Sequence, residues 1–189
     1  MIRLVEVKGY KCLRYIRQPL RPFHILVGPN ASGKSTFLDV VLFVRDLVEK
    51  DVERAVRSRA RTLQELVWKG EDNDFEISLE LELPKDLQSQ RNEYTYRAIR
   101  YEIRVGRERN GEMQILVENL WLISEIPDWK EPSRPEPREL FPQEPRVPKT
   151  IVVEPGKHSP SGWRKVMSRL REGRVYVRSE RTLCRSMGT

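Results

Sequence analysis

The chain has 189 residues, of which 35 are lysine or arginine and 28 are aspartate or glutamate, so its formal net charge is +7 and its mean hydropathy is −0.62. A chain of this length forms one domain, or one domain with a small annex. No apolar run approaches the roughly 20 residues that a membrane helix needs, and the N-terminus lacks the apolar region of a signal peptide. We therefore expect a cytoplasmic protein without a membrane span. Only two cysteines, Cys12 and Cys184, are present, which excludes a disulfide framework and a cysteine-based zinc site.

The basic residues are unevenly distributed along the chain. Residues 1–128 hold 21 basic and 21 acidic side chains, so the whole excess of positive charge lies in residues 129–189. A basic segment of this kind binds nucleic acid or an acidic partner, or it is a solvated arginine-rich surface. The sequence leaves both interpretations open.

The first seventy residues show the periodicity of three strands and a helix. Short strands are predicted over residues 2–8 and 10–17, and a compact apolar run predicts a buried strand over residues 23–27. A turn-forming stretch follows at residues 28–33. Apolar residues at i, i+3 and i+4 spacing then predict a helix that starts near Gly33 and packs against a sheet. Thr62 and Glu65 have the spacing of a capping box for a further short helix.

The middle of the chain predicts an antiparallel meander. Residues 75–83 alternate between apolar and acidic or polar side chains, which indicates a half-buried strand with its glutamates on a solvated face. Two more strands are predicted over residues 94–105 and 112–123, joined by a hairpin at Asn110 and Gly111. We accordingly divide the chain into a nucleotide-binding core (1–70), an antiparallel β lobe (71–126), a proline-rich linker (127–149) and a basic C-terminal segment (150–189). In the last segment we expect a strand at 151–153, a helix near 162–171 and a strand at 174–177.

One motif carries chemistry. Residues 28–35 match the pattern G-x-x-x-x-G-K-[ST] of a phosphate-binding loop, between a predicted strand and a predicted helix. The glycines allow successive backbone N–H groups to surround a polyphosphate, and the helix N-terminus adds partial positive charge. Lys34 would bind the β- and γ-phosphates as the catalytic cation, and the Ser35 hydroxyl would ligate Mg²⁺. The predicted binding residues are Gly28, Pro29, Asn30, Ala31, Ser32, Gly33, Lys34, Ser35 and Thr36.

Three consecutive parts of the sequence resemble the N-terminal half of the ATPase head in the RecF, SMC and ABC-related group. They are the residues from Val7 to Leu13, a partly apolar strand, and the stretch from Ile25 to Asp39 that contains Gly-Pro-Asn-x-x-Gly-Lys-Ser. The resemblance implies ATP and Mg²⁺ as ligands, and ATP hydrolysis with ATP-dependent homodimerisation in the complete protein. It further implies a nucleotide contact for Lys11, for which a surface lysine is the open alternative. It also implies an α/β fold, a mixed sheet with the strand before the loop near its centre and an antiparallel lobe beside it.

The chain departs from that group after residue 127. The heads of the group add a C-terminal half with a signature helix, an apolar strand ending in Asp-Glu and a switch histidine. Here Ile151-Val152-Val153-Glu154 lacks the aspartate and is followed by proline, and Ser159-Pro160-Ser161-Gly162 comes after it rather than before it. Gln64 and Gln114 are unsupported candidates for a glutamine loop. We interpret the chain as an N-terminal half that is a fragment, a truncated product or one piece of a split ATPase, so that hydrolysis needs a second half or a partner chain.

Two other functions are open alternatives. The basic final third would suit a DNA-binding protein, whose affinity falls steeply with salt. The other alternative is a kinase or GTPase of another phosphate-loop class. The sequence has no Asn-Lys-x-Asp pattern, however, and its β meander directly after the first helix is unlike a nucleotide kinase.

Overall fold

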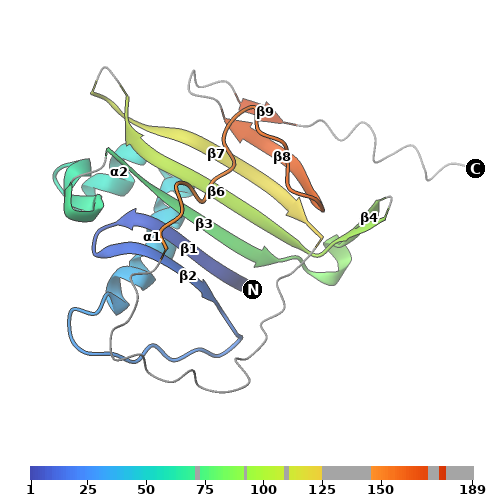
Figure 1. The fold of residues 1–189 in the computed structure, drawn as a ribbon, viewed down its shortest axis with the longest axis horizontal. Coiled ribbons are helices and arrows are strands. Elements are labelled where there is room, and N and C mark those ends of the chain that lie inside the picture. The colour runs from blue at the N-terminus through green and yellow to red at the C-terminus, as the bar shows by residue number, and fades with distance from the viewer. Residues whose placement is uncertain (71–72, 92, 109–110, 125–145, 170–174, 178–189) are drawn as a thin grey trace, which may run out of the picture.

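The computed structural model describes residues 1–70, 73–91, 93–108, 111–124, 146–169 and 175–177 (Figure 1). The helices are α1 (Lys34–Glu49), α2 (Val52–Arg57) and the short 3-10 helices η1 (Leu63–Leu66), η2 (Trp68–Gly70) and η3 (Lys85–Leu87). The strands are β1 (Ile2–Tyr10), β2 (Leu13–Pro19), β3 (Asp74–Glu82), β4 (Ser89–Arg91), β5 (Tyr94–Tyr96), β6 (Ala98–Arg107), β7 (Met113–Ile123), β8 (Trp163–Arg169) and β9 (Val175–Val177). No helix among the described residues is long and apolar enough to cross a membrane.

Seven strands form one twisted sheet in the order β2-β1-β3-β6-β7-β8-β9. Each neighbouring pair in it is antiparallel. Strands from the first twenty residues therefore share a sheet with strands from residues 74–123, and β4 and β5 form a separate small hairpin. The α/β class and the antiparallel pairing expected for the middle of the chain are confirmed. The expected mixed sheet with a separate lobe beside it was wrong, because β1 and β2 join the same antiparallel sheet as β3, β6 and β7.

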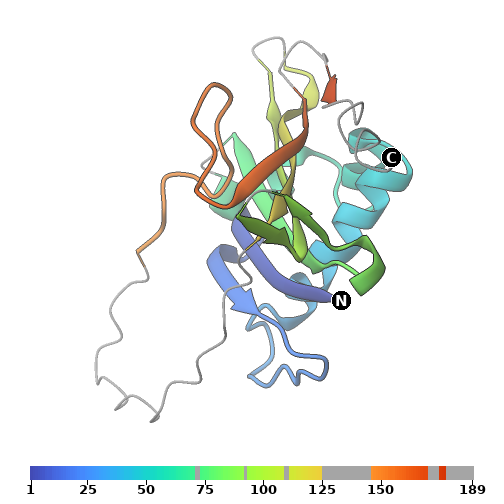
Figure 2. The same ribbon diagram turned by 90° about the vertical axis from the view of Figure 1, so that its right-hand side faces the viewer.

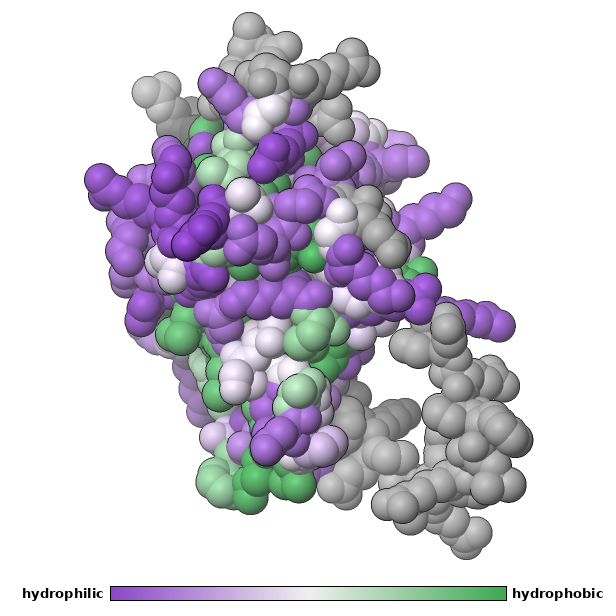
Figure 3. Space-filling model, turned by 90° about the vertical axis from the view of Figure 1, so that its left-hand side faces the viewer, coloured by the Kyte–Doolittle hydropathy of each residue, from purple (hydrophilic) through white to green (hydrophobic). Residues whose placement is uncertain are grey.

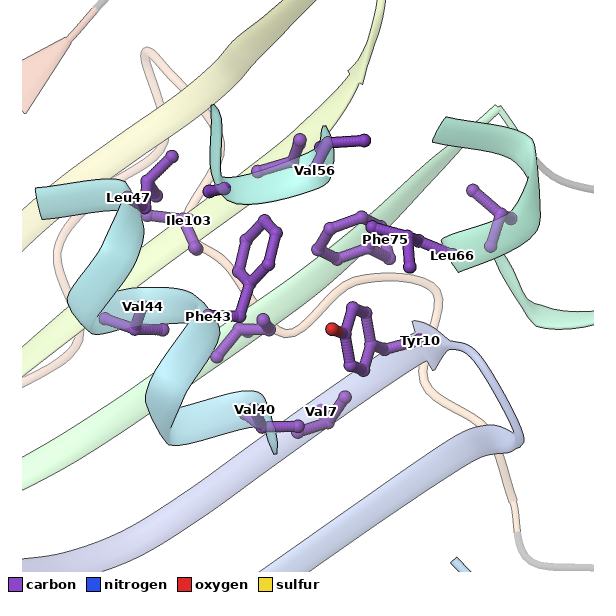
Figure 4. Packing of buried hydrophobic residues seen from close by; sticks show 14 of the residues in the cluster. Val7, Tyr10, Val40, Phe43, Val44, Leu47, Val56, Leu66, Phe75 and Ile103 are labelled. Carbon is purple, nitrogen blue, oxygen red and sulfur yellow. The ribbon is translucent and has the colours of Figure 1, made fainter. Parts of the chain in front are cut away.

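The main core lies between this sheet and α1. Alternate residues of β1, β3 and β6 point toward the helix, where α1 presents its own apolar stripe. Three aromatic rings form the centre, with ring centroids 5.0 Å apart for Tyr10 and Phe75, 5.3 Å for Phe43 and Phe75, and 5.7 Å for Tyr10 and Phe43 (Figure 4). Aromatic pairs at these separations stabilise a core beyond the area that they bury. The core fixes α1, and with it the loop that precedes α1.

The opposite face of the sheet is covered by the chain between residues 146 and 162, so that the sheet lies between the helices and this segment (Figure 2). The glutamates of β3 that we expected on a solvated face are among the covered residues. Glu76 and Glu80 are only 1% and 3% exposed. The prediction of a solvated face was wrong because a period-two pattern shows that two faces differ, and does not show whether the polar face is covered.

Three further expectations about local structure were wrong. Residues 151–153 form no strand, and the helix expected near 162–171 is the strand β8, which pairs with β7 from Glu118 to Ile123. The strand expected over 94–105 is divided into β5 and β6 at Arg97. A phase slip in its pattern between Ala98 and Tyr101 indicates a bulge there, but the register shift lies between Arg104 and Val105. In each case a tertiary partner outweighs the local pattern. Most of the predicted linker 127–149 lies outside the described residues, as does Asn110 of the predicted hairpin.

Candidate functional site

The predicted phosphate-binding loop leads directly into α1. The helix begins at Lys34, and its N-cap residue Gly33 has the left-handed backbone angle φ of 92°. A Cβ atom on Gly33 would lie 3.1 Å from Leu13 Cδ2 and 3.3 Å from Cys12 Sγ. Glycine is therefore required at this position both by the backbone conformation and by the close approach of the β1–β2 turn.

The side chain of Lys34 lies within the curve of the loop. Its Nζ donates hydrogen bonds to the carbonyl oxygens of Gly28 at 2.8 Å and Pro29 at 2.6 Å, and to Ser32 Oγ at 3.3 Å. The loop is tightened by a bond from Ser32 N to Pro29 O at 3.3 Å. The sequence motif thus brings four of its predicted members together around one ammonium group.

The other predicted members of the loop are at its tip or on the first turn of α1. Asn30 and Ala31 are exposed, and Ala31 has a positive φ of 62°. Ser35 is exposed on the first turn. Thr36 faces the β1–β2 turn instead, where its Oγ1 accepts a hydrogen bond from Cys12 Sγ at 3.3 Å.

Lys11, which we expected near the nucleotide, forms an ion pair with Asp39 on α1. Its Nζ donates to Asp39 Oδ2 at 2.7 Å, and Tyr10 and Arg59 donate to the same carboxylate at 2.7 Å each. Burial alone would raise the pKa of Asp39, but these hydrogen bonds hold the pKa below its usual value. Burial and the contact with Asp39 raise the pKa of Tyr10 above its usual range. Asp39 thereby fastens the β1–β2 turn to the helix that follows the loop.

Arg59 extends this cluster along α1. Its second terminal nitrogen pairs with Asp46 at 2.8 Å, two helical turns after Asp39. Hydrogen bonds from Arg59 and Arg45 lower the pKa of Asp46 to about 2. The sequence analysis missed Asp39, Asp46 and Arg59, although the seven-residue spacing of two aspartates on one helix was a signal that both lie on one face.

The segment before the loop is the largest departure from expectation. Residues 23–27 were predicted to be a buried strand, yet they belong to no strand, and Phe23, Ile25 and Val27 are 78%, 66% and 89% exposed. Leu26, between them, packs against the main core. The segment is exposed except at Leu26, and no described strand lies beside it to complete a sheet.

Hydrophobic side chains also gather on the outer side of α1. Leu38 and Leu42 are 58% and 45% exposed, one helical turn apart. Figure 3 shows hydrophobic side chains collected at the lower end of the face on which the extended segment lies. Soluble monomers seldom expose contiguous apolar surface unless it receives a partner.

The residues considered for hydrolysis are engaged elsewhere. Glu154 pairs with Arg104 at 2.7 Å. Gln64 donates to the Gly70 carbonyl, and Gln114 donates to Glu108 at 3.2 Å. These contacts do not bring any of the three to the loop. Among the described residues no group of three or more histidine, cysteine or acidic side chains is arranged to hold a metal ion.

Comparisons with known proteins relate the chain to a family. The family model described as AAA ATPase domain matches residues 1–126. The chain is 32% identical over 106 residues to OLD nuclease from Thermus scotoductus, a match that covers 42% of this chain and 20% of that protein. The chain thus spans about a fifth of the length of this curated relative. A solved structure described under ATP-driven dimerization and DNA stimulated activation of SMC ATPases aligns with a TM-score of 0.44 and 22% identity, covering 64% of this chain and 68% of the other.

Proposed function

Since this chain belongs to the AAA ATPase domain family, it is an ATP-binding module, and we propose that it is the N-terminal half of a RecF/SMC/ABC-type ATPase head that binds Mg-ATP through residues 28–36. The observation that supports this most directly is the position of the Lys34 ammonium, which lies 2.8 Å and 2.6 Å from two loop carbonyls at the N-terminus of α1. A triphosphate would replace these carbonyls as the partner of the ammonium.

Each loop residue has a role in this proposal that follows from its chemistry. The backbone N–H groups of the loop and of the first turn of α1 would bind the phosphates, with the helix dipole adding partial positive charge. The exposed hydroxyl of Ser35 is an oxygen ligand of the kind that Mg²⁺ prefers, and it is the residue that would hold the ion. Mg²⁺ would neutralise charge on the phosphates. Lys11 is paired with Asp39, so a nucleotide contact for it would share its ammonium with that carboxylate.

The surface beside the loop supports the proposal that a second half completes the head. The exposed side of residues 23–27 and the outer side of α1 are apolar and adjoin the loop in sequence. An extended segment without a neighbouring strand can pair with a strand added from another chain or from further sequence. We propose that this second half supplies the residues for hydrolysis, and that ATP-dependent homodimerisation belongs to the complete protein.

Calorimetric titration with Mg-ATP tests the proposal. We expect saturable binding by the unmodified chain and no measurable binding by Lys34→Ala, because a cationic partner of the phosphates is lost. Lys69→Ala is a matched control, since Lys69 lies on η2 and contacts the Trp68 ring. Thermal melts of all three chains establish that they are folded. Equal affinity of Lys34→Ala and the unmodified chain would contradict the proposed site.

A second candidate function, DNA binding, is favoured by the charge of the described C-terminal residues. Residues 146–169 contain six basic side chains and one acidic side chain, Glu154. Arg169 pairs with Glu118, and Lys165 lies over the Trp121 ring. A binding assay with duplex DNA at 50 and 200 mM salt tests the candidate, because phosphate contacts predict a steep loss of affinity with salt. Absence of binding at the lower salt concentration would exclude it for this chain.

A further inference from the structure

The sheet face opposite α1 carries a cluster of charged side chains, which we call the polar floor. Its residues come from three adjacent strands and are between 0% and 9% exposed. They are Glu6 on β1, Glu76 and Glu80 on β3, and Arg100, Glu102 and Arg104 on β6. Burial of charged groups is unfavourable unless each is paired and hydrogen-bonded. The floor therefore depends on the partners that cover it.

Arg100 provides pairing within the floor. It forms ion pairs with Glu6 at 2.9 Å, Glu80 at 2.9 Å and Glu102 at 2.8 Å. Burial alone would lower the pKa of Arg100, but the neighbouring carboxylates raise it above its ordinary value. One guanidinium that serves three carboxylates leaves carboxylate oxygens that need further donors.

Some of the further donors belong to the sheet, since Tyr15 donates to Glu6, and Trp121 and Asn119 donate to Glu102. Others come from residues 150–154, which we call the strap. It crosses the floor in front of β3 and β6, as the orange coil in Figure 1. Arg104 links the two parts, because its terminal nitrogen contacts Glu76 at 2.6 Å, Thr150 Oγ1 at 2.9 Å and Glu154 at 2.7 Å. Both ends of the strap thus contact the floor through Arg104, Thr150 by a hydrogen bond and Glu154 by an ion pair.

The floor binds the strap mainly through the main chain of the strap. The N–H of Ile151 donates to Glu76 Oε2 at 2.6 Å, and the N–H of Val153 donates to Glu102 Oε2 at 3.0 Å. Both carbonyls accept side-chain hydrogen bonds at 2.9 Å, from Arg100 and Asn119 respectively. Ile151 and Val153 thus each use both their N–H and their carbonyl group, as alternate residues of a β-strand do. Their partners are side chains of the sheet, however, and not the backbone of a neighbouring strand.

The strap is held by contacts that water can replace. It has no strand pairing. Its apolar contacts are two small clusters, one of Ile151 and Val152 with Val117 and the partly buried Tyr15, and one in which Val153 packs against Ala98, Trp121 and Ile123. Uncovered carboxylates and guanidinium groups regain hydration, so a buried ionic cluster gives little net stability. Regions with few apolar contacts open at a lower free energy than the whole domain.

We propose that the polar floor is a groove that binds an extended polypeptide through its main chain, and that residues 150–154 are its exchangeable ligand within the same chain. The groove is on the face of the sheet opposite α1, so this inference does not depend on nucleotide binding.

Amide hydrogen exchange of the full chain, followed by NMR, tests whether the strap opens independently. We expect the amides of Ile151 and Val153 to be protected relative to an unstructured peptide, with protection factors at least tenfold below those of Ile77 and Ile103 on the central strands. Protection factors equal to those of the central strands would overturn the proposal, because the strap would then be part of the cooperative core. Complete absence of protection would overturn it as well.

A peptide added in trans tests whether the floor is a groove. In the full chain, Ile151→Pro together with Val153→Pro removes the two N–H donors of the strap. A peptide of residues 148–156 should then bind saturably, followed through the fluorescence of Trp121, whose indole N–H donates to Glu102 at 3.0 Å. N-methylation of the peptide at Ile151 and Val153 should weaken binding at least tenfold. N-methylation at Val152, whose N–H donates only within the strap to Thr150 Oγ1, should weaken it less.

Equal weakening by the two modified peptides, or no binding to a variant whose sheet is intact by NMR, would overturn the proposal. If the variant does not fold, hydrogen exchange of the unmodified chain decides the question.

Discussion

Asp39→Asn should destabilise the chain by about 2 kcal/mol at pH 7. The carboxylate accepts three hydrogen bonds of 2.7 Å, two of them from the cations Lys11 and Arg59, and its side chain is 20% exposed. Hydrogen bonds to charged groups contribute about 1.5–3 kcal/mol each and neutral ones about 0.5–1.5 kcal/mol. Asparagine keeps an acceptor oxygen but not the charge, so the loss is roughly 1 kcal/mol per bond. Partial exposure reduces the sum of three to about 2 kcal/mol.

The effect should depend on pH in a defined direction. The folded pKa of Asp39 lies below its unfolded value, which is about 3.9. The stabilisation is therefore fully present above the unfolded pKa and is lost as the pH falls through the folded pKa. The difference between the unmodified chain and Asp39→Asn should consequently shrink as the pH falls below about 4.

Urea denaturation at several pH values, with Glu49→Gln as control, measures this difference. Glu49 is on the same helix, its side chain is 60% exposed and its nearest cation is Arg45 at 3.9 Å, so we expect its replacement to change stability little. A destabilisation by Asp39→Asn that is the same at pH 3 as at pH 7 would refute the electrostatic explanation. Absence of any destabilisation at pH 7 would show that the cluster does not hold the β1–β2 turn on α1.

Two further substitutions test the loop and the polar floor. Gly33→Ala should lower the free energy of unfolding by at least about 1 kcal/mol more than Gly111→Ala does. Both glycines have a positive φ, but only at Gly33 would a Cβ atom contact other atoms. Equal losses in chemical denaturation would contradict this. Arg100→Met should cost about 3–5 kcal/mol because it leaves three buried carboxylates without their cation, and a melting temperature unchanged from that of the unmodified chain would show that these carboxylates find other partners.

The sequence predicts the elements whose pattern is local and strong. The spacing of Phe37, Val40, Val44 and Leu47 predicts α1, and all four residues are buried in it. The alternation from Phe75 onward predicts β3, whose apolar side faces α1. The motif predicts the loop residues around Lys34, because a phosphate-binding loop requires glycines for its backbone and a lysine ammonium at fixed spacing.

The remainder depends on long-range contacts that no local pattern contains. The apolar run of residues 23–27 predicts a buried strand, but burial also requires neighbours, and none of the described strands lies beside it. The alternation in β3 predicts that its glutamates are solvated. In the structure they are covered by Arg100, Arg104 and residues 150–154, which are distant in sequence and which the local pattern does not reveal. The sequence predicts that Lys11 is a nucleotide ligand or a surface lysine. It does not reveal the ion pair with Asp39, because that partner is 28 residues away.

The covering of the sheet by residues 146–162 has a consequence for where the folding unit ends. The family model stops at residue 126, yet β7 forms its outer pairing with β8, and Glu76 and Glu102 receive backbone N–H groups from Ile151 and Val153. A polypeptide cut at the family boundary would expose one edge of β7 together with a face of ionised side chains. The boundary of the family match and the extent of the sheet therefore differ by at least forty residues, since the sheet includes β8 as far as Arg169.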